Sequence, residues 1–197
     1  RSYVFSNKAG SLGAYVNLDE APFDNPAVLK ALSQAIDRRA FAEVLGPDTC
    51  VASLQPMGPG FPGHVPELDD MIDDFYDPDA ARATLEAEGV AGTTINAITV
   101  GLPLFEQTGE LLRAMWEAVG IDLVLQSHPV SSVTGEFLKG AAPMYNAALS
   151  GGAEAALMID QTYINLLSPG TEPAELVELY EVANAQLVGS AERTAAW

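Results

Sequence analysis

The stretch APFDNPAVLKALSQAIDRRAFAEVLG, residues 21–46, predicts a turn followed by a helix and carries no recognisable catalytic chemistry. Asn25 can cap free N–H groups, and Pro26 at the first helical position sacrifices no hydrogen bond. Apolar residues then recur at helical spacing until Gly46: Val28, Leu32, Ala35, Ile36 and Phe41. We therefore expect one helix that packs on a sheet through Val28, Leu32 and Ile36.

The rest of the chain alternates strands and helices, which indicates an α/β fold. The strand predicted at 95–100, the helix that follows and the strand at 121–127 form a βαβ unit with parallel strands. The other expected strands are 14–18 and 144–149, and the other expected helices begin at Asp77-Pro78, Val133 and Pro173. The last helix should bury Leu176, Leu179, Tyr180, Ala183 and Leu187.

Composition limits the function classes. The chain has 197 residues, of which 48% are hydrophobic, and a net charge of −18, so an ordered domain is expected and nucleic acid would be repelled. Cys50 is a lone cysteine, and His64 and His128 have no Cys or His neighbours at ligand spacing. We therefore expect no metal site and no cofactor.

Candidate catalytic motifs are weak. The acidic run ELDDMIDDFYDPD, residues 67–79, lacks the turn glycine of a calcium loop and reads as a solvated loop that leads to an Asp77 cap. Ser131, Ser132 and Thr134 have no His or Asp companion nearby, so nucleophilic catalysis is unsupported. A hydrolase stays an alternative that would need two facing carboxylates or a triad.

A stretch that overlaps residues 21–46 resembles the signature of a known protein family. YVNLDEAPFDNPAVLKALSQAIDRRAF, residues 15–41, resembles the signature of extracytoplasmic solute-binding proteins of family 5, the dipeptide, oligopeptide and nickel-type receptors of ABC importers. Later segments resemble the family in the same order: the proline-rich loop after Cys50, the helix in FYDPDAARATLEAEGV, and ELLRAMWEAVGIDLVLQS. The resemblance covers nearly the whole chain from about Ala14.

The resemblance implies a fold and a function. Family members are much longer, so residues 1–197 are expected to form a single periplasmic-binding-protein-like lobe with a mixed or parallel sheet, the second of two. Such a receptor closes on a peptide or other small amphipathic solute, delivers it to the ABC permease and performs no catalysis. It would be monomeric and periplasmic or a cell-surface lipoprotein. The alternative is a solute-sensing module fused to a DNA-binding or signalling domain.

The expected ligand contacts follow the third strand. Peptide-binding members carry Gly-Trp and a nearby aspartate there, whereas this sequence has SGGAEAALMID, residues 150–160. The candidate ligand-binding residues are Ser150, Gly151, Gly152 and Glu154, with Gln55 and Met57 of the proline-rich loop at the rim. A plain surface turn is the competing interpretation of 150–154. Because the Trp and the aspartate of the peptide-binding members are missing, the sequence leaves open whether the solute is a peptide.

Overall fold

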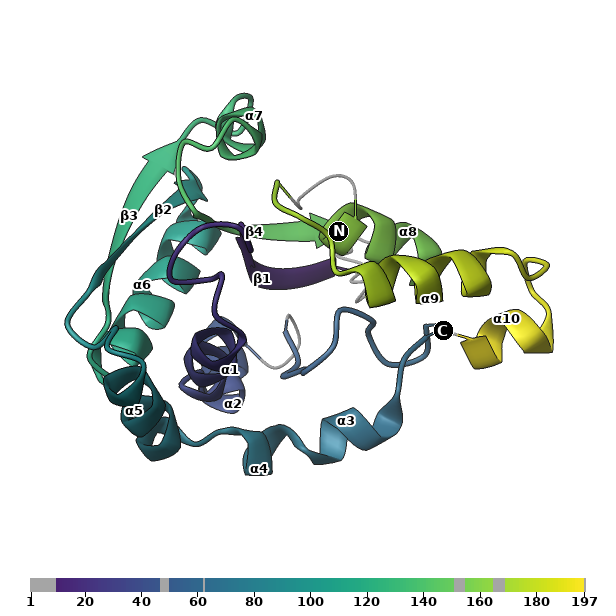
Figure 1. The fold of residues 1–197 in the computed structure, drawn as a ribbon, viewed down its shortest axis with the longest axis horizontal. Coiled ribbons are helices and arrows are strands. Elements are labelled where there is room, and N and C mark those ends of the chain that lie inside the picture. The colour runs from purple at the N-terminus through teal and green to yellow at the C-terminus, as the bar shows by residue number, and fades with distance from the viewer. Residues whose placement is uncertain (1–9, 47–49, 62, 151–154, 165–168, 197) are drawn as a thin grey trace, which may run out of the picture.

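The computed structural model describes residues 10–46, 50–61, 63–150, 155–164 and 169–196 (Figure 1). Its centre is a four-stranded sheet of order β1-β4-β2-β3. The edge strand β1 (Gly10–Val16) runs antiparallel to β4 (Met144–Ser150), with Gly10 opposite Ser150. The strands β4, β2 (Thr94–Val100) and β3 (Asp122–His128) are mutually parallel. The predicted α/β class with a mixed sheet is confirmed.

The βαβ unit is confirmed as well. Helix α6 (Pro103–Glu117) connects β2 to β3, and the two strands pair in parallel register from Thr94 opposite Asp122 to Val100 opposite His128. Proline stands at the start of α6, where its missing N–H costs nothing. Gly120 follows the helix with a φ of 91°, a conformation that favours glycine.

The single helix predicted for 25–46 is wrong. The structure has α1 (Pro26–Gln34) and α2 (Arg38–Leu45), separated by a short turn. Asn25 caps α1 as expected, and its side chain accepts a hydrogen bond from the Ala27 N–H at 2.9 Å. Asp37 begins the second helix by accepting from the Ala40 N–H at 2.9 Å. The break follows because an aspartate that caps a helix cannot lie inside one.

The turn changes the position of Ile36. Val28 and Leu32 are buried in the main core, as predicted, but Ile36 lies outside the helix and is only half-buried against that core. The buried stripe therefore ends at Ala35, the C-cap of α1, which is 2% exposed in the same core, and Phe41 belongs to a second helix.

The acidic run also differs from the prediction. Instead of a loop it forms two short helices, α3 (Pro66–Asp70) and α4 (Ile72–Phe75). Asp77 then caps α5 (Pro78–Ala87) by accepting from the Ala80 N–H at 2.9 Å, and Ala81 and Leu85 are fully buried, both as expected. Four of the acids, Glu67, Asp69, Asp73 and Asp74, lie in the first turns of α3 and α4, where helix dipoles favour negative charge.

The C-terminal third contains elements that the sequence did not reveal. Helix α7 (Val133–Leu138) matches its predicted range, but α8 (Ala155–Ile159), the π-helical turn η1 (Asp160–Ile164) and α10 (Ala191–Ala196) were not expected. Helix α9 (Ala174–Asn184) buries Ala183, whereas Leu179 and Leu187 are 58% and 81% exposed. The predicted apolar face is therefore wrong at these two leucines, since α9 contacts mainly α8 and α10 and not the sheet.

Helices cover both faces of the sheet. On one face the main core joins α1, α5 and α6 to the strands, and Trp116 is buried there with its indole N–H donating to the Leu32 carbonyl at 3.0 Å. On the other face Phe137 of α7 packs with Ile98 and Tyr145. Figure 1 shows α7 on the opposite side of the strands from α1 and α2. Within the described chain, every helix is too short or too polar to cross a membrane.

Candidate ligand cavity

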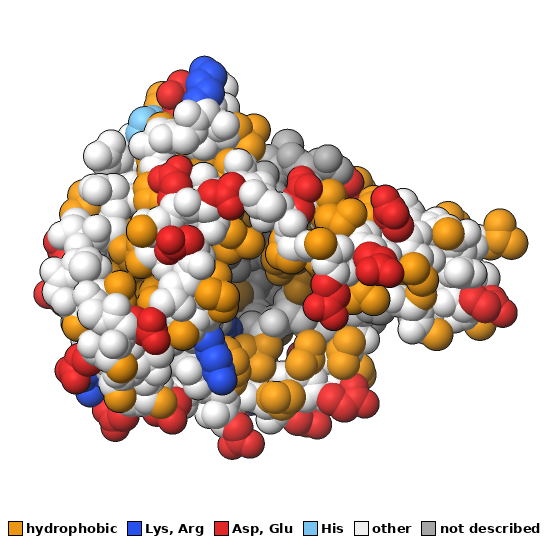
Figure 2. Space-filling model, in the orientation of Figure 1, with side chains coloured by type: hydrophobic (Ala, Val, Ile, Leu, Met, Phe, Trp, Pro, Cys, Tyr) orange, Lys and Arg blue, Asp and Glu red, His pale blue; other side chains and the backbone are white. Residues whose placement is uncertain are grey.

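A cavity of about 710 Å³ lies beside the edge strand β1. All seven residues of β1 line it, and its other walls include α1, α2, the segment 50–59 and α6, with residues of β4, η1 and α9. The space-filling view shows hydrophobic side chains gathered around this hollow and acidic side chains mostly farther out (Figure 2). Its volume falls in the range typical of small-molecule sites.

The cavity wall differs in charge from the molecule as a whole. The sequence contains 27 acidic residues, yet no Asp or Glu belongs to the described wall. Arg38 is the one charged side chain that lines the described part of the cavity. The wall is otherwise apolar, with hydroxyl and amide groups at a few points, among them Ser11, Ser53 and Asn146.

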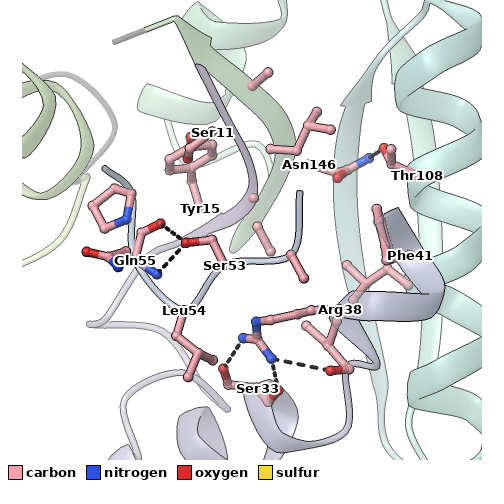
Figure 3. Close-up of a pocket in the computed structure, with 18 of the residues that line it drawn as sticks. Ser11, Tyr15, Ser33, Arg38, Phe41, Ser53, Leu54, Gln55, Thr108 and Asn146 are labelled. Carbon is pink, nitrogen blue, oxygen red and sulfur yellow. Dashed lines mark hydrogen bonds between the residues drawn. The ribbon is translucent and has the colours of Figure 1, made fainter. Parts of the chain in front are cut away.

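Arg38 reaches into this space from the start of α2 (Figure 3). Its Nη1 donates to the Ser33 carbonyl at 2.9 Å and to the Ile36 carbonyl at 3.3 Å, and its Nη2 donates to the Ser33 hydroxyl at 2.7 Å. One face of the guanidinium stacks on Phe75, 5.4 Å from the ring centroid. Burial lowers the pKa of Arg38, which reflects the cost of desolvating its charge.

No carboxylate compensates that charge within the part of the chain that the structure describes. Among the described residues, no Asp or Glu carboxylate oxygen lies within 4.0 Å of an Arg38 guanidinium nitrogen. The Asp37 carboxylate next to it is committed to the α2 cap, and Asp73 pairs with Arg39. The sequence motif Asp37-Arg38 thus orients two helices and forms no ion pair of its own.

A buried polar network forms a second point on the wall. The Asn146 side-chain amide Nδ2 donates to the Phe105 carbonyl at 2.9 Å and to the hydroxyls of Thr99 and Thr108 at 3.1 and 3.2 Å. Asn146 is 5% exposed and lines the cavity together with Thr108 (Figure 3). The network joins β4, β2 and the start of α6, and therefore fixes this side of the cavity.

Two of the predicted contact residues, Gln55 and Met57, lie on the cavity wall. The Gln55 amide bonds the backbone of Val65 through both of its ends, each at 2.8 Å, and it also donates to Asp69 at 3.2 Å. Asp69 in turn bonds the His64 imidazole at 2.9 Å. Gln55 therefore closes the loop 55–65, and its capacity to bind a ligand is largely used.

Met57 is 4% exposed and packs with Ala155, Met158 and Phe61 in a small separate cluster. It joins the proline-rich loop to α8, so one residue contributes both to the cavity wall and to the packing of that loop. A rim contact with a solute stays a prediction for both Gln55 and Met57.

Of the four ligand contacts predicted after the third strand, only Ser150 belongs to the described residues. Ser150 ends β4 and pairs with Gly10, which lines the cavity. Gly151, Gly152 and Glu154 lie outside the described residues. The loop that follows β3 does not line this cavity. The ligand role of residues 150–154 stays a prediction.

Side chains of the types that bind metal ions do not cluster in the described part of the chain. No three His, Cys, Asp or Glu side chains gather there in a group that could hold a metal ion. Cys50 lines the cavity, and burial raises the pKa of its thiol, which makes it less reactive than a free cysteine. The described wall is mostly apolar, with a few polar groups.

The sequence pattern missed Arg38 and Asn146 as cavity residues. An Asp-Arg pair late in a predicted helix signals local pairing, and an asparagine in a strand signals nothing specific. The two side chains meet one cavity only because β4 and α2 are brought together from positions more than 100 residues apart in the sequence. A single sequence carries no sign of such a juxtaposition.

Residues 2–167 match the family model "Bacterial extracellular solute-binding proteins, family 5 Middle". Heme-binding protein A of Haemophilus influenzae is 26% identical over 136 residues, which are 65% of this chain and 24% of that protein. AgaA of A. tumefaciens R10, solved with agropinic acid, has a TM-score of 0.78 at 18% identity. DppA of Helicobacter pylori, solved with the peptide STSA, has a TM-score of 0.79 at 17% identity.

The two structural matches extend over 96% and 95% of this chain but over only 40% and 38% of the chains compared. The 197 residues therefore span about two fifths of the length of these two proteins, and the 136 residues matched to heme-binding protein A span about a quarter of it. At this level of identity the two solved structures establish a shared fold.

Proposed function

Because this chain belongs to the bacterial extracellular solute-binding proteins of family 5, we propose that it forms one lobe of a receptor that delivers a solute to an ABC-importer permease. The observation that carries the proposal is the cavity beside β1, with its apolar wall and few polar anchors. Such a wall suits binding by shape and burial, and among its described residues there is no pair of acid and base groups as in a catalytic site.

The two-lobe organisation is part of the proposal. Residues 1–197 would supply one lobe, and a second lobe would close over the solute from the other side. The length comparison supports this, since the similar proteins hold more than twice as much chain. Residues 150–154 would then contact the solute at the lobe boundary. In that case Gly152→Trp should weaken solute binding in the two-lobe receptor and leave its melting temperature unchanged; unchanged affinity would exclude the contact.

The solute class stays broad in this proposal. The similar proteins are named for, or were solved with, a peptide, agropinic acid and heme. A peptide or another small amphipathic molecule fits the cavity size, and the sequence around 150–154 departs from the peptide-binding pattern. The receptor would act outside the cytoplasm, as the family name implies.

The experiment that tests the function is native mass spectrometry of the two-lobe receptor, purified without refolding. We expect a mass excess that corresponds to one small molecule per chain and disappears after denaturation. The retained compound is then identified and its affinity measured by calorimetry. A receptor that shows no mass excess, and whose melting temperature no peptide or small organic solute raises, would contradict the proposal.

A further inference from the structure

The cavity wall has a charge pattern that the binding of uncharged apolar molecules would not need. An acidic protein of net charge −18 keeps every described Asp and Glu off the wall and places one arginine there. Acids spread at random over the surface would have contributed several groups to a wall of this size. A cationic solute would meet the guanidinium without a compensating carboxylate, so the electrostatics oppose it.

The guanidinium of Arg38 also has unused donors in a specific place. Three of its five N–H groups bond Ser33 and Ile36, and the two Ser33 contacts lie along the Nη1–Nη2 edge. The N–H of Nε and the second N–H of Nη2 remain on the adjacent edge. That edge presents two parallel N–H groups, which is the geometry that grips a carboxylate with two hydrogen bonds.

The free edge faces the cavity. In Figure 3 the bonds to Ser33 run away from the strands, and the other side of the guanidinium is turned toward the space below β1 and Tyr15. The bonds to α1 and the stacking on Phe75 hold the side chain in place before any ligand arrives. A donor pair fixed in advance loses little entropy on binding.

We propose that the cavity selects an amphipathic solute with a single anionic group, bound as a carboxylate on the Nε–Nη2 edge of Arg38, while its apolar body fills the space beside β1. This inference rests on the proposed solute-binding function and adds the chemical class of the solute. The carboxylate of the solute would pair with the half-buried Arg38, with which no described carboxylate of the chain pairs. The apolar walls would supply most of the binding free energy.

The test compares three probes with the same ten-carbon chain, below their micelle-forming concentrations: decanoate, decan-1-ol and decyltrimethylammonium. Binding to the 197-residue chain is measured by calorimetry, and occupancy of the cavity is read independently from the rate at which Cys50 is alkylated. We expect decanoate to bind at least ~10-fold more tightly than decan-1-ol, to protect Cys50, and the cation to bind most weakly.

Variants separate the arginine edge from general charge. Arg38→Gln should remove the preference for decanoate over decan-1-ol, so that the two affinities measured on the same variant agree within about twofold. Arg38→Lys should keep part of the preference, because the charge stays and the two-bond fork is lost. The control is Arg39→Gln, since Arg39 is a neighbouring arginine with a 57% exposed side chain paired to Asp73, and it should keep the full preference.

Several outcomes would overturn the inference. Equal affinity for decanoate and decan-1-ol in the unaltered chain would do so without any variant, even if Arg38→Gln failed to fold. Equal losses in the Arg38 and Arg39 variants would show a general charge effect. Tight decanoate binding without protection of Cys50 would place the site elsewhere. None of these results would contradict the proposed solute-binding function, because native mass spectrometry of the two-lobe receptor tests that function separately.

Discussion

At the scale of single residues, Asn146 shows how one side chain can hold three elements together. Its Nδ2 group serves the Phe105 carbonyl and two threonine hydroxyls at the meeting point of β4, β2 and α6. Buried polar groups are costly when they lose partners, and low exposure strengthens the bonds that remain. The cavity wall on this side therefore depends on the amide as much as on apolar packing.

Truncation of this amide should be measurable. We expect Asn146→Ala to lower the free energy of unfolding by about 1–3 kcal/mol, because the Phe105 carbonyl and the threonine hydroxyls lose a donor. The matched control is Asn96→Ala on β2, where the side chain is exposed, and its effect should stay within about 0.5 kcal/mol. Urea titrations followed by circular dichroism give both values. Equal effects at the two positions would contradict a structural role for the network.

Cys50 offers a pH-dependent readout of the same cavity. Burial raises the pKa of its thiol above the ordinary 9.0, and only the thiolate reacts with iodoacetamide. The alkylation rate of the folded chain should therefore reach half its maximum at a higher pH than that of the chain unfolded in urea. At pH 8 the folded chain should react more slowly. Coincident pH profiles would show that the thiol is in free contact with water.

At the scale of elements, the break between α1 and α2 determines which side chains belong to the core. Leu32 is 2% exposed inside the main core, whereas Ile36 is half-buried in the turn. The turn is stabilised from both sides, since Asp37 caps α2 and Arg38 donates to the Ser33 carbonyl of α1 and to the Ile36 carbonyl of the turn. The guanidinium that faces the cavity thus also fixes the angle between two helices.

This geometry separates two leucine-sized side chains of one sequence stripe. We expect Leu32→Ala to lower the free energy of unfolding by about 2–5 kcal/mol and Ile36→Ala to lower it by less than about 2 kcal/mol. A continuous helix from 25–46 would have made the two costs alike. Denaturant unfolding of both variants decides between the two geometries, and a loss at Ile36 equal to that at Leu32 would favour the continuous helix.

The elements that the sequence predicted well are those whose local pattern agrees with their tertiary setting. The parallel pair β2 and β3 with α6 between them, and α5 with its Asp77 cap, follow from apolar spacing and capping residues alone. The helix break at Asp37 could not be predicted, because aspartate at this position fits a helix interior or a cap. In the structure Asp37 caps α2, and Arg38 bonds Ser33 five residues before it across the turn.

The candidate site was predictable only in part for the same reason. Gln55 and Met57 lie on the cavity wall as part of the continuous segment 50–59, whose residues all line it. Arg38 and Asn146 reach the cavity through pairings between distant segments, and periodicity does not report such pairings. The apolar pattern of residues 176–187 also gave a wrong prediction. Leu179 of α9 and Leu187 after it follow a helical spacing that predicts burial, yet both side chains are exposed.

At the scale of the whole molecule, the distribution of charge complements the cavity. The chain carries −18 net charges, while its described cavity carries one cation and no acid. The surrounding surface repels anions in general, so an anionic solute would be retained through local contact with Arg38 and burial of its apolar part, and not through long-range attraction. Affinity should therefore depend only weakly on salt above physiological ionic strength.

A lobe that encloses its solute together with a second lobe offers half of the contacts alone. If the proposed organisation holds, the 197-residue chain should fold and bind the natural solute at least ~100-fold more weakly than the two-lobe receptor, a difference of about 2.7 kcal/mol. Calorimetry on both proteins with the solute retained by the receptor gives the ratio, and circular dichroism confirms that the shorter chain is folded. Equal affinities would place the complete site within this chain, so that the cavity beside β1 would be the whole binding site and the second lobe would add nothing to it.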